Sequence, residues 1–267
     1  DPGRENASVK TIPKVIGGFT VKCADLAETL YSQALDEIHR VSSCRAAEAT
    51  KLLENIFRSV NIALVNELKV VYEAMDIDVH EVIEAAATKP FGFMAFHPGP
   101  GLGGHCIPID PFYLTWKARE FGKNTRFIEL AGEINTAMPD YVISKVTDAL
   151  NDDGKAIKGS RILILGLAYK ANVDDCRESP SFVLMEKLEA KGANVEFHDA
   201  YVPQIPPTRE HAHFTGKKSA DIVDRYDLVL LSTNHKEYSN FDFSNFSCPI
   251  VDTRNCLKNK PPKYYQA

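Results

Sequence analysis

The sequence predicts an α/β protein with an all-helical central domain followed by a Rossmann-like domain built on a parallel β-sheet. Residues 44–75 contain neither glycine nor proline and repeat apolar side chains every three or four positions, which is typical of a long amphipathic helix. From Arg161 onwards, short apolar runs alternate with helical patterns, which is typical of βαβ units. We therefore expect the helical domain over residues 23–155 and the sheet domain over residues 156–267.

The predicted elements follow one another along the chain. A strand-like segment at residues 14–19 precedes the long helix of 44–75. A short helix over 111–121 and a long amphipathic helix over 127–151 complete the helical domain. The sheet domain is expected to hold strands at 161–166, 194–198, 228–231 and 250–251, with helices starting near Ser181 and around Asp221.

Composition and charge argue against several classes of protein. The formal net charge of -5 is spread without a basic block, which gives no support to nucleic acid or anionic membrane as partners. No apolar run approaches the roughly 20 residues that a membrane span needs. The six cysteines lie far apart without a CxxC pair, which favours reduced thiols over disulfides or a metal site. We expect a cytoplasmic protein without a bound metal.

The densest chemical signal is a glycine-rich segment that ends in a cysteine. Glycines at 99, 101, 103 and 104 allow the backbone to approach a ligand closely, and Cys106 follows with Asp110 four residues later. This pattern indicates a thiol nucleophile beside a carboxylate; a purely structural loop is the alternative. A cysteine hydrolase using His105 or His97 is disfavoured, because adjacent side chains on an extended segment point apart.

One face of the long helix carries four polar side chains. Glu48, Lys51, Asn55 and Arg58 follow at intervals of three, four and three residues, which keeps them on one side of a helix. A solvated surface explains this spacing equally well. A lysine ammonium can stabilise a developing oxyanion, and an asparagine amide can donate a hydrogen bond beside it.

A possible phosphate site follows the first strand of the sheet domain. Residues 166–170 lack the GxGxxG pattern, so a dinucleotide site is only weakly indicated, and Asp199 at the end of the second strand is equally ambiguous. Lys170 and Arg177 precede Ser179-Pro180, which reads as the capped start of a helix, and helix N-termini favour anions. An exposed charged loop remains the alternative.

Four segments together resemble the nucleotide-sugar 6-dehydrogenases, the UDP-glucose/GDP-mannose dehydrogenase family. Residues 96–111 are similar to the family's catalytic loop and residues 47–55 to its second signature. Residues 166–180 resemble the UDP-binding signature, and residues 251–255 resemble the later segment whose arginine reaches the active site. The order of these segments also matches, so the resemblance extends over nearly the whole chain.

The resemblance implies roles for individual positions. Cys106 is the nucleophile that forms a thiohemiacetal and then a thioester, and Asp110 helps to handle the hydrolytic water. The remaining implied positions are Lys51 and Asn55 in the catalytic site, and Arg58, Gly103, Lys170, Arg177 and Arg254 in substrate binding.

The resemblance further implies NAD as cofactor and a four-electron oxidation of the C6 hydroxyl of a UDP-sugar to a carboxylate. Residues 89–94 are similar to members that use UDP-N-acetylglucosamine; UDP-N-acetylmannosamine and UDP-glucose are the alternatives. Residues 1–22, opening on Asp1-Pro2-Gly3, are expected to be the remnant of an N-terminal NAD-binding domain that holds the cofactor site. Residues 23–155 then form a central domain of a homodimer, and residues 156–267 bind the UDP-sugar. By itself, such a fragment would be a UDP-sugar-binding and dimerisation unit without turnover.

Overall fold

A small parallel sheet precedes the helical part of the protein. The computed structural model describes residues 8–267, so the opening Asp1-Pro2-Gly3 lies outside the described part. Strand β1 (Lys14–Ile16) pairs in parallel with β2 (Ile38–Arg40), and α1 (Val21–Tyr31) connects them. The sequence patterns predicted neither α1 nor β2. Large apolar side chains on and before α1, including Phe19 and Leu26, are exposed.

The helical part consists of α2 (Cys44–Ala74), α3 (Val79–Ala87), α4 (Asp110–Glu120) and α5 (Arg126–Asp152). Helix α2 begins at Ser43, whose hydroxyl accepts a hydrogen bond from the Ala46 backbone N–H and caps the first turn. The long helices and α4 agree with the prediction to within two residues at each end. Helix α3 was not predicted.

Helix α2 buries polar side chains and exposes part of its apolar face. Asn55 is 2% exposed and Asn66 is fully buried, whereas Leu53 is 66% exposed and Phe57 is 44% exposed. The interpretation of the polar face as a solvated surface is therefore wrong for Asn55. The burial of Asn55 is tolerated because its side-chain amide is hydrogen-bonded to Asp110 and Arg58.

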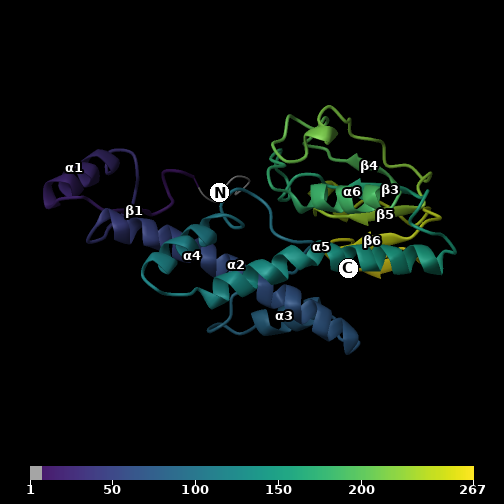
Figure 1. The fold of residues 1–267 in the computed structure, drawn as a ribbon, viewed down its shortest axis with the longest axis horizontal. Helices are drawn as coiled ribbons and strands as arrows, with labels where there is room; N and C mark the ends of the chain where they lie inside the picture. The colour runs from purple at the N-terminus through teal and green to yellow at the C-terminus, as the bar shows by residue number, and fades with distance from the viewer. Residues whose placement is uncertain (1–7) are drawn as a thin grey trace.

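Helix α5 joins the helical part to the sheet part, as Figure 1 shows along the lower edge of the sheet. Its N-terminal half packs against α2, and Val142, Val146 and Leu150 in its C-terminal half are fully buried in the core that also contains Ile162 and Ile164 of the sheet. The two parts thus share one continuous helix and its apolar contacts. None of the helices in residues 8–267 is long and apolar enough to cross a bilayer.

The sheet part holds five parallel strands in the order β4-β3-β5-β6-β7. Their bounds are β3 (Arg161–Leu165), β4 (Asn194–His198), β5 (Leu228–Leu231), β6 (Ile250–Asp252) and β7 (Tyr264–Gln266). Ile162 and Ile164 face one core, whereas Leu163 and Leu165 face a second core formed with Tyr238 and Phe243. The Rossmann-like parallel sheet is confirmed, and β7 was not predicted.

The connections between the strands contain α6 (Pro180–Ala190), the 3₁₀ turn η1 (Ala212–Phe214) and the short helix α7 (Lys236–Ser239). The prediction of a helix around Asp221 is wrong. The backbone N–H of Ala220 donates to the Phe197 carbonyl at 2.7 Å, so this segment is tied to the end of β4 rather than to itself. Side-chain bonds from Arg225 and Tyr226 to Glu196 hold the same segment.

The strand order creates a natural binding position. The chain passes from β3 to β4 on one side and then returns to β5 on the other side of β3. In open parallel sheets, ligands bind outside the carboxyl ends of the strands at such a switch point. The loops that follow β3, β5 and β6 meet at this end, and they carry the predicted substrate residues Lys170, Arg177 and Arg254.

Candidate active site

The segment of residues 97–109, called the thiol loop, is fixed at its start by buried side-chain amides. The Gly99 N–H donates to Asn66 Oδ1 at 2.9 Å, and Asn66 Nδ2 donates to Asn135 Oδ1 at 2.9 Å. Asn135 Nδ2 in turn donates to the Ser59 carbonyl at 3.1 Å. Because Asn66 and Asn135 are both buried, this relay holds the loop entry firmly between α2 and α5. Neither amide was predicted as a site residue.

Arg254 lies directly against the thiol loop at Gly99. A Cβ at position 99 would come within 2.2 Å of Arg254 Nη1, so the guanidinium can occupy this position only beside a glycine. Arg254 Nε donates to the Ser232 carbonyl at 2.9 Å, which fixes the side chain after β6. Burial lowers the pKa of Arg254 to about 10, although Asp252 opposes the shift, and the group is still a cation at neutral pH. The resemblance implied that this arginine reaches the active site, and in the structure it lies against the loop that carries Cys106.

Four predicted residues form one polar cluster around the first residue of α4. Asp110 Oδ2 accepts a hydrogen bond from Asn55 Nδ2 at 2.8 Å and lies 3.6 Å from Lys51 Nζ. Asn55 Oδ1 accepts a bond from Arg58 Nη2 at 2.7 Å. The side chain of Lys51 is 66% exposed and that of Asp110 is 15% exposed. The cluster therefore combines an exposed cation with a carboxylate that is largely shielded from solvent and hydrogen-bonded.

Cys106 lies one turn before this carboxylate. The Asp110 N–H donates to the Cys106 carbonyl at 2.9 Å, so the thiol residue and the carboxylate share the turn that opens α4. Cys106 is half-buried, whereas the neighbouring His105 is exposed. His97 stacks on His80 of α3 with ring centroids 6.3 Å apart. These positions give no support to a hydrolase in which either histidine serves Cys106.

Residues 166–180, called the nucleotide loop, run from the end of β3 to the start of α6. Ser179 caps α6 as predicted, accepting from the Ser181 N–H at 3.3 Å, and Pro180 occupies the first turn. Arg177 donates through Nε and Nη2 to Asp175, and its side chain is 69% exposed. This pairing holds the pKa of Asp175 below its ordinary value. Arg177 must therefore leave Asp175, or share it, to hold a phosphate; Lys170 lies half-buried in the same loop.

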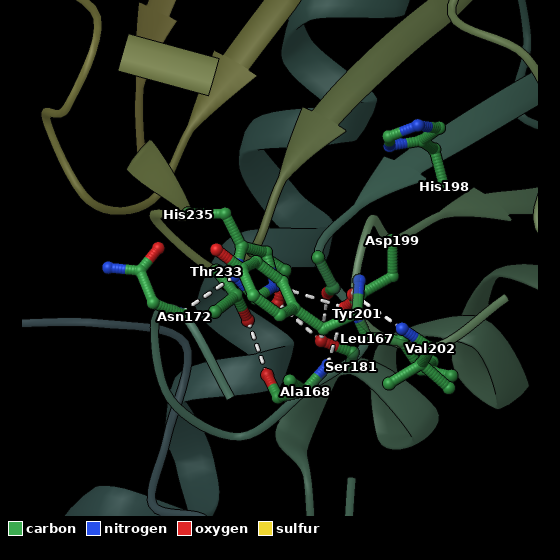
Figure 2. Close-up of polar contacts among 12 residues, drawn as sticks. Leu167, Ala168, Asn172, Ser181, His198, Asp199, Tyr201, Val202, Thr233 and His235 are labelled. Atoms are coloured by element: carbon green, nitrogen blue, oxygen red, sulfur yellow. Dashed lines mark hydrogen bonds and ion pairs between the residues drawn. The ribbon is translucent and has the colours of Figure 1, made fainter. Parts of the chain in front are cut away.

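Asp199 supports the nucleotide loop from inside, as Figure 2 shows. Its Oδ2 accepts from the Leu167 and Ala168 N–H groups at 2.7 and 2.9 Å, and its Oδ1 accepts from the Tyr201 and Val202 N–H groups at 2.8 and 3.0 Å. The side chain is fully buried. The sequence left the role of Asp199 open. In the structure, its carboxylate is a structural anion that accepts the hydrogen bonds of the loop amides at Leu167 and Ala168.

His235 completes this support (Figure 2). Its Nδ1 lies 2.9 Å from the Asn172 N–H, which can only donate, so Nδ1 accepts and the ring proton is on Nε2. Nε2 lies 3.0 Å from Asp199 Oδ2 and donates to it. Burial alone would raise the pKa of Asp199, but the bond from His235 and the backbone N–H groups outweigh this and lower it. The contact between Asp199 and His235 was not predicted, because the two residues lie 36 positions apart in the sequence.

His80 is a buried group next to the thiol loop that makes stability depend on pH. Its Nε2 has no hydrogen-bond partner, and burial, with Lys69 adding to it, lowers its pKa to about 4. The unfolded chain takes up this proton near the ordinary value of 6.5, so the contribution of His80 to stability is lost as pH falls from 6.5 towards 4.

We therefore expect the wild type to lose roughly 2 to 4 kcal/mol more unfolding free energy than His80→Asn between pH 7 and pH 4. Urea titrations at stepped pH measure this difference. His39→Asn, at an exposed histidine of β2, is the matched control. If the unfolding free energies of the wild type and His80→Asn fell equally between pH 7 and pH 4, burial would not suppress protonation of His80.

No group of three or more His, Cys, Asp or Glu side chains within residues 8–267 is arranged to hold a metal ion.

Comparison with known proteins extends over both parts of the fold. The UDP-glucose/GDP-mannose dehydrogenase family, central domain, matches residues 45–137, and the UDP binding domain of the same family matches residues 163–259. The chain is 36% identical over 261 residues to Protein CapL of Staphylococcus aureus, covering 94% of this chain and 59% of that protein. It is 34% identical over 246 residues to a UDP-N-acetyl-D-glucosamine 6-dehydrogenase of Pseudomonas aeruginosa, covering 92% and 57%.

Solved structures agree with the sequence comparison. A structure of UDP-D-ManNAc dehydrogenase from Pyrococcus horikoshii superposes with a TM-score of 0.84 at 30% identity, covering 96% of this chain and 60% of that one. The chain thus spans less than two thirds of the length of these relatives. Since two domain models of one family together match more than half of the chain, and the fold agrees in both parts, the chain belongs to the UDP-glucose/GDP-mannose dehydrogenase family.

Proposed function

We propose that this chain provides the thiol site and the UDP-sugar site of an NAD-dependent UDP-sugar 6-dehydrogenase. The enzyme would oxidise the C6 hydroxymethyl group of the sugar to a carboxylate by removing four electrons. The observation that carries the proposal is the position of Asp110, one turn after Cys106 and in contact with Asn55 and Lys51. Family membership supports it independently.

Each residue of the site has a role in this proposal. Removal of a first hydride turns the C6 alcohol into an aldehyde. The Cys106 thiolate adds to the aldehyde carbon, and the resulting thiohemiacetal becomes a thioester when a second hydride is removed. Lys51, whose ammonium lies 3.6 Å from Asp110, has the role of stabilising the oxyanion that forms as the thiol, and later water, attacks the carbonyl carbon. Asp110, oriented by Asn55, accepts a proton from the attacking water. Hydrolysis then releases the carboxylate and restores the thiol.

NAD would accept the hydrides in this reaction, and the described sheet does not fit it. The turn after β3 lacks the glycine pattern of a dinucleotide site, and its amides at Leu167 and Ala168 already donate to Asp199. We therefore propose that NAD binds to a domain preceding this chain, of which residues 1–22 are the last part. Residues 23–155 and 156–267 are the proposed central and UDP-binding domains.

UDP-N-acetylglucosamine is the proposed substrate. The similarity of residues 89–94 to members that use this sugar supports it, as does the name of the Pseudomonas aeruginosa relative. The name of the Pyrococcus horikoshii structure favours UDP-N-acetylmannosamine as the alternative, with UDP-glucose a further one. Arg58, Gly103, Lys170, Arg177 and Arg254 are the proposed substrate-binding residues. Of these, Arg254 and Gly103 belong to the contact between the thiol loop and the sheet part.

We further propose a cytoplasmic homodimer. Leu53, Phe57 and Leu64 form an apolar stripe on α2 that is exposed in the single chain, and Trp116 on α4 is exposed as well. Extensive apolar surface of this kind marks protein interfaces. The cysteines are all unpaired in the structure, which suits a reducing compartment.

The stoichiometry of cofactor reduction tests the reaction. With the preceding NAD-binding domain present, each molecule of UDP-N-acetylglucosamine consumed is expected to yield two NADH and one carboxylate, measured by absorbance and mass spectrometry. The present chain alone is expected to bind the sugar nucleotide without turnover. One NADH per sugar with an accumulating aldehyde would contradict the four-electron reaction.

Arg177→Ala is expected to weaken UDP binding by roughly 1.5 to 3 kcal/mol, the worth of a charge-assisted hydrogen bond to phosphate. The variant also leaves the Asp175 carboxylate unpaired beside the ligand. Calorimetric titration measures the change, and Lys191→Ala, at an exposed lysine after α6, is the matched control. Equal affinities of the wild type and Arg177→Ala would make Arg177 a solvated loop residue.

A further inference from the structure

The thiol loop and the nucleotide loop meet at Tyr169, a side chain without a part in the proposed chemistry. A Cβ at position 103 would lie 2.6 Å from Tyr169 Cβ, and a Cβ at position 104 would lie 2.9 Å from Tyr169 Cε2. The backbone at these two glycines therefore rests directly on the tyrosine, along the length of its side chain. Gly104 also has a φ of +79°, which a side chain would strain.

A backbone hydrogen bond joins the same two loops. The Gly104 N–H donates to the Arg177 carbonyl at 3.2 Å, while the Tyr169 N–H donates to the Asp175 carbonyl at 3.0 Å. The two ends of the nucleotide loop are thus tied together beneath the glycines. Cys106 follows Gly104 by two residues, so a movement of the nucleotide loop is passed to the thiol over a very short stretch of chain.

The nucleotide loop itself is held from the sheet side. Thr233 Oγ1 donates to the Ala168 carbonyl at 2.6 Å, and His235 Nδ1 accepts from the Asn172 N–H at 2.9 Å, as Figure 2 shows. Tyr169 lies between these two anchored positions. The backbone on both sides of Tyr169 is thus bonded to the loop after β5, which fixes the position from which its ring extends.

We propose that Tyr169 is a positioning residue, whose ring transmits the geometry of the nucleotide loop to the thiol loop and so places Cys106. This inference rests on the proposed function only in taking the nucleotide loop as the place where UDP binds. The contacts with Gly103 and Gly104 are made by Cβ and ring carbons, so the ring rather than the hydroxyl performs this role. Tyr169→Phe should therefore retain it, and Tyr169→Ala should lose it.

The reactivity of individual thiols measures this role in the chain as it stands. Iodoacetamide labelling, followed by peptide mass spectrometry, gives a separate rate for each cysteine. Cys23 and Cys44 are exposed thiols outside both loops and serve as internal references, and Cys248, buried in the second core of the sheet part, reports global unfolding. Without the ring, the thiol loop loses its support, and half-buried Cys106 should be labelled at least about fivefold faster, which corresponds to about 1 kcal/mol of lost loop order.

In Tyr169→Phe, Cys106 is expected to be labelled at a rate within about twofold of the wild type. Tyr169→Ala and Tyr169→Leu are compared with it at unchanged Cys44 and Cys248 rates. An unchanged Cys106 rate in Tyr169→Ala would overturn the proposal. A parallel rise at Cys248 would do so too, because it would show general destabilisation. If Tyr169→Ala does not fold, the Tyr169→Leu variant decides in the same way.

Saturating UDP gives the second readout. UDP should slow labelling of Cys106 in the wild type and in Tyr169→Phe, and this effect should disappear in Tyr169→Ala although calorimetry still detects bound UDP. Equal slowing in all three proteins would mean that UDP shields the thiol directly and that Tyr169 transmits nothing. Failure of the wild type to bind UDP would contradict the proposed function, while the labelling rates without UDP would still decide the role of the ring.

Discussion

Cys106→Ala is expected to abolish carboxylate formation in the enzyme that carries its NAD-binding domain, with UDP-sugar affinity unchanged to within a few fold. The alanine removes the only atom that forms the proposed thioester, and no later step can replace a covalent intermediate. The Asp110 cluster should persist, because Cys106 contributes its backbone carbonyl, rather than its sulfur, to the turn of α4. Carboxylate product and NADH are measured together.

Cys44→Ala is the matched control for this prediction. Cys44 is exposed at the start of α2, and its Sγ contacts the Gly17 carbonyl rather than either loop of the site. Its activity should equal that of the wild type. NADH production by Cys106→Ala at nearly the wild-type rate would exclude the thioester route.

Asp199→Asn is expected to cost roughly 3 to 5 kcal/mol of unfolding free energy, because several hydrogen bonds to a buried carboxylate weaken at once and buried N–H groups lose their acceptor. Asp199 accepts from four backbone N–H groups and from His235 Nε2. An asparagine would turn an NH₂ group towards donors that have no other acceptor. The nucleotide loop should therefore lose its shape together with its stability.

Urea unfolding of the isolated chain measures this cost, with Asp221→Asn at an exposed carboxylate as the control. We expect UDP affinity to fall in Asp199→Asn even under conditions where the protein remains folded. A loss of less than about 1 kcal/mol with unchanged UDP binding would contradict the role of Asp199 as the internal anion of the loop.

The sequence predicted those parts of the site that are set by local spacing. Lys51, Asn55 and Arg58 share a helix face because of the α-helical repeat. Asp110 follows Cys106 by four residues in the sequence, and a backbone hydrogen bond closes this turn before α4. The alternation of strands and helices similarly predicted the parallel sheet. Their roles in chemistry came from the resemblance, since spacing alone also fits a solvated surface.

Contacts between distant segments were not predictable in this way. Asn66 and Asn135 lie 69 residues apart, and nothing in either neighbourhood indicates that two buried amides will meet. Helix α2 also reverses the usual rule, burying Asn55 while exposing Leu53, because Asn55 is hydrogen-bonded to Asp110 at the start of α4. The wrong helix around Asp221 has a similar cause, since tertiary bonds to β4 override local propensity.

Calorimetric titration of this chain with UDP, UDP-N-acetylglucosamine and UDP-glucose tests the central claim most directly, which is that the two parts of the fold create a UDP-sugar site beside Cys106. We predict binding of one nucleotide per chain, tighter for the N-acetylated sugar than for UDP-glucose. Absence of binding heat with all three nucleotides, from a chain that unfolds cooperatively, would contradict the claim.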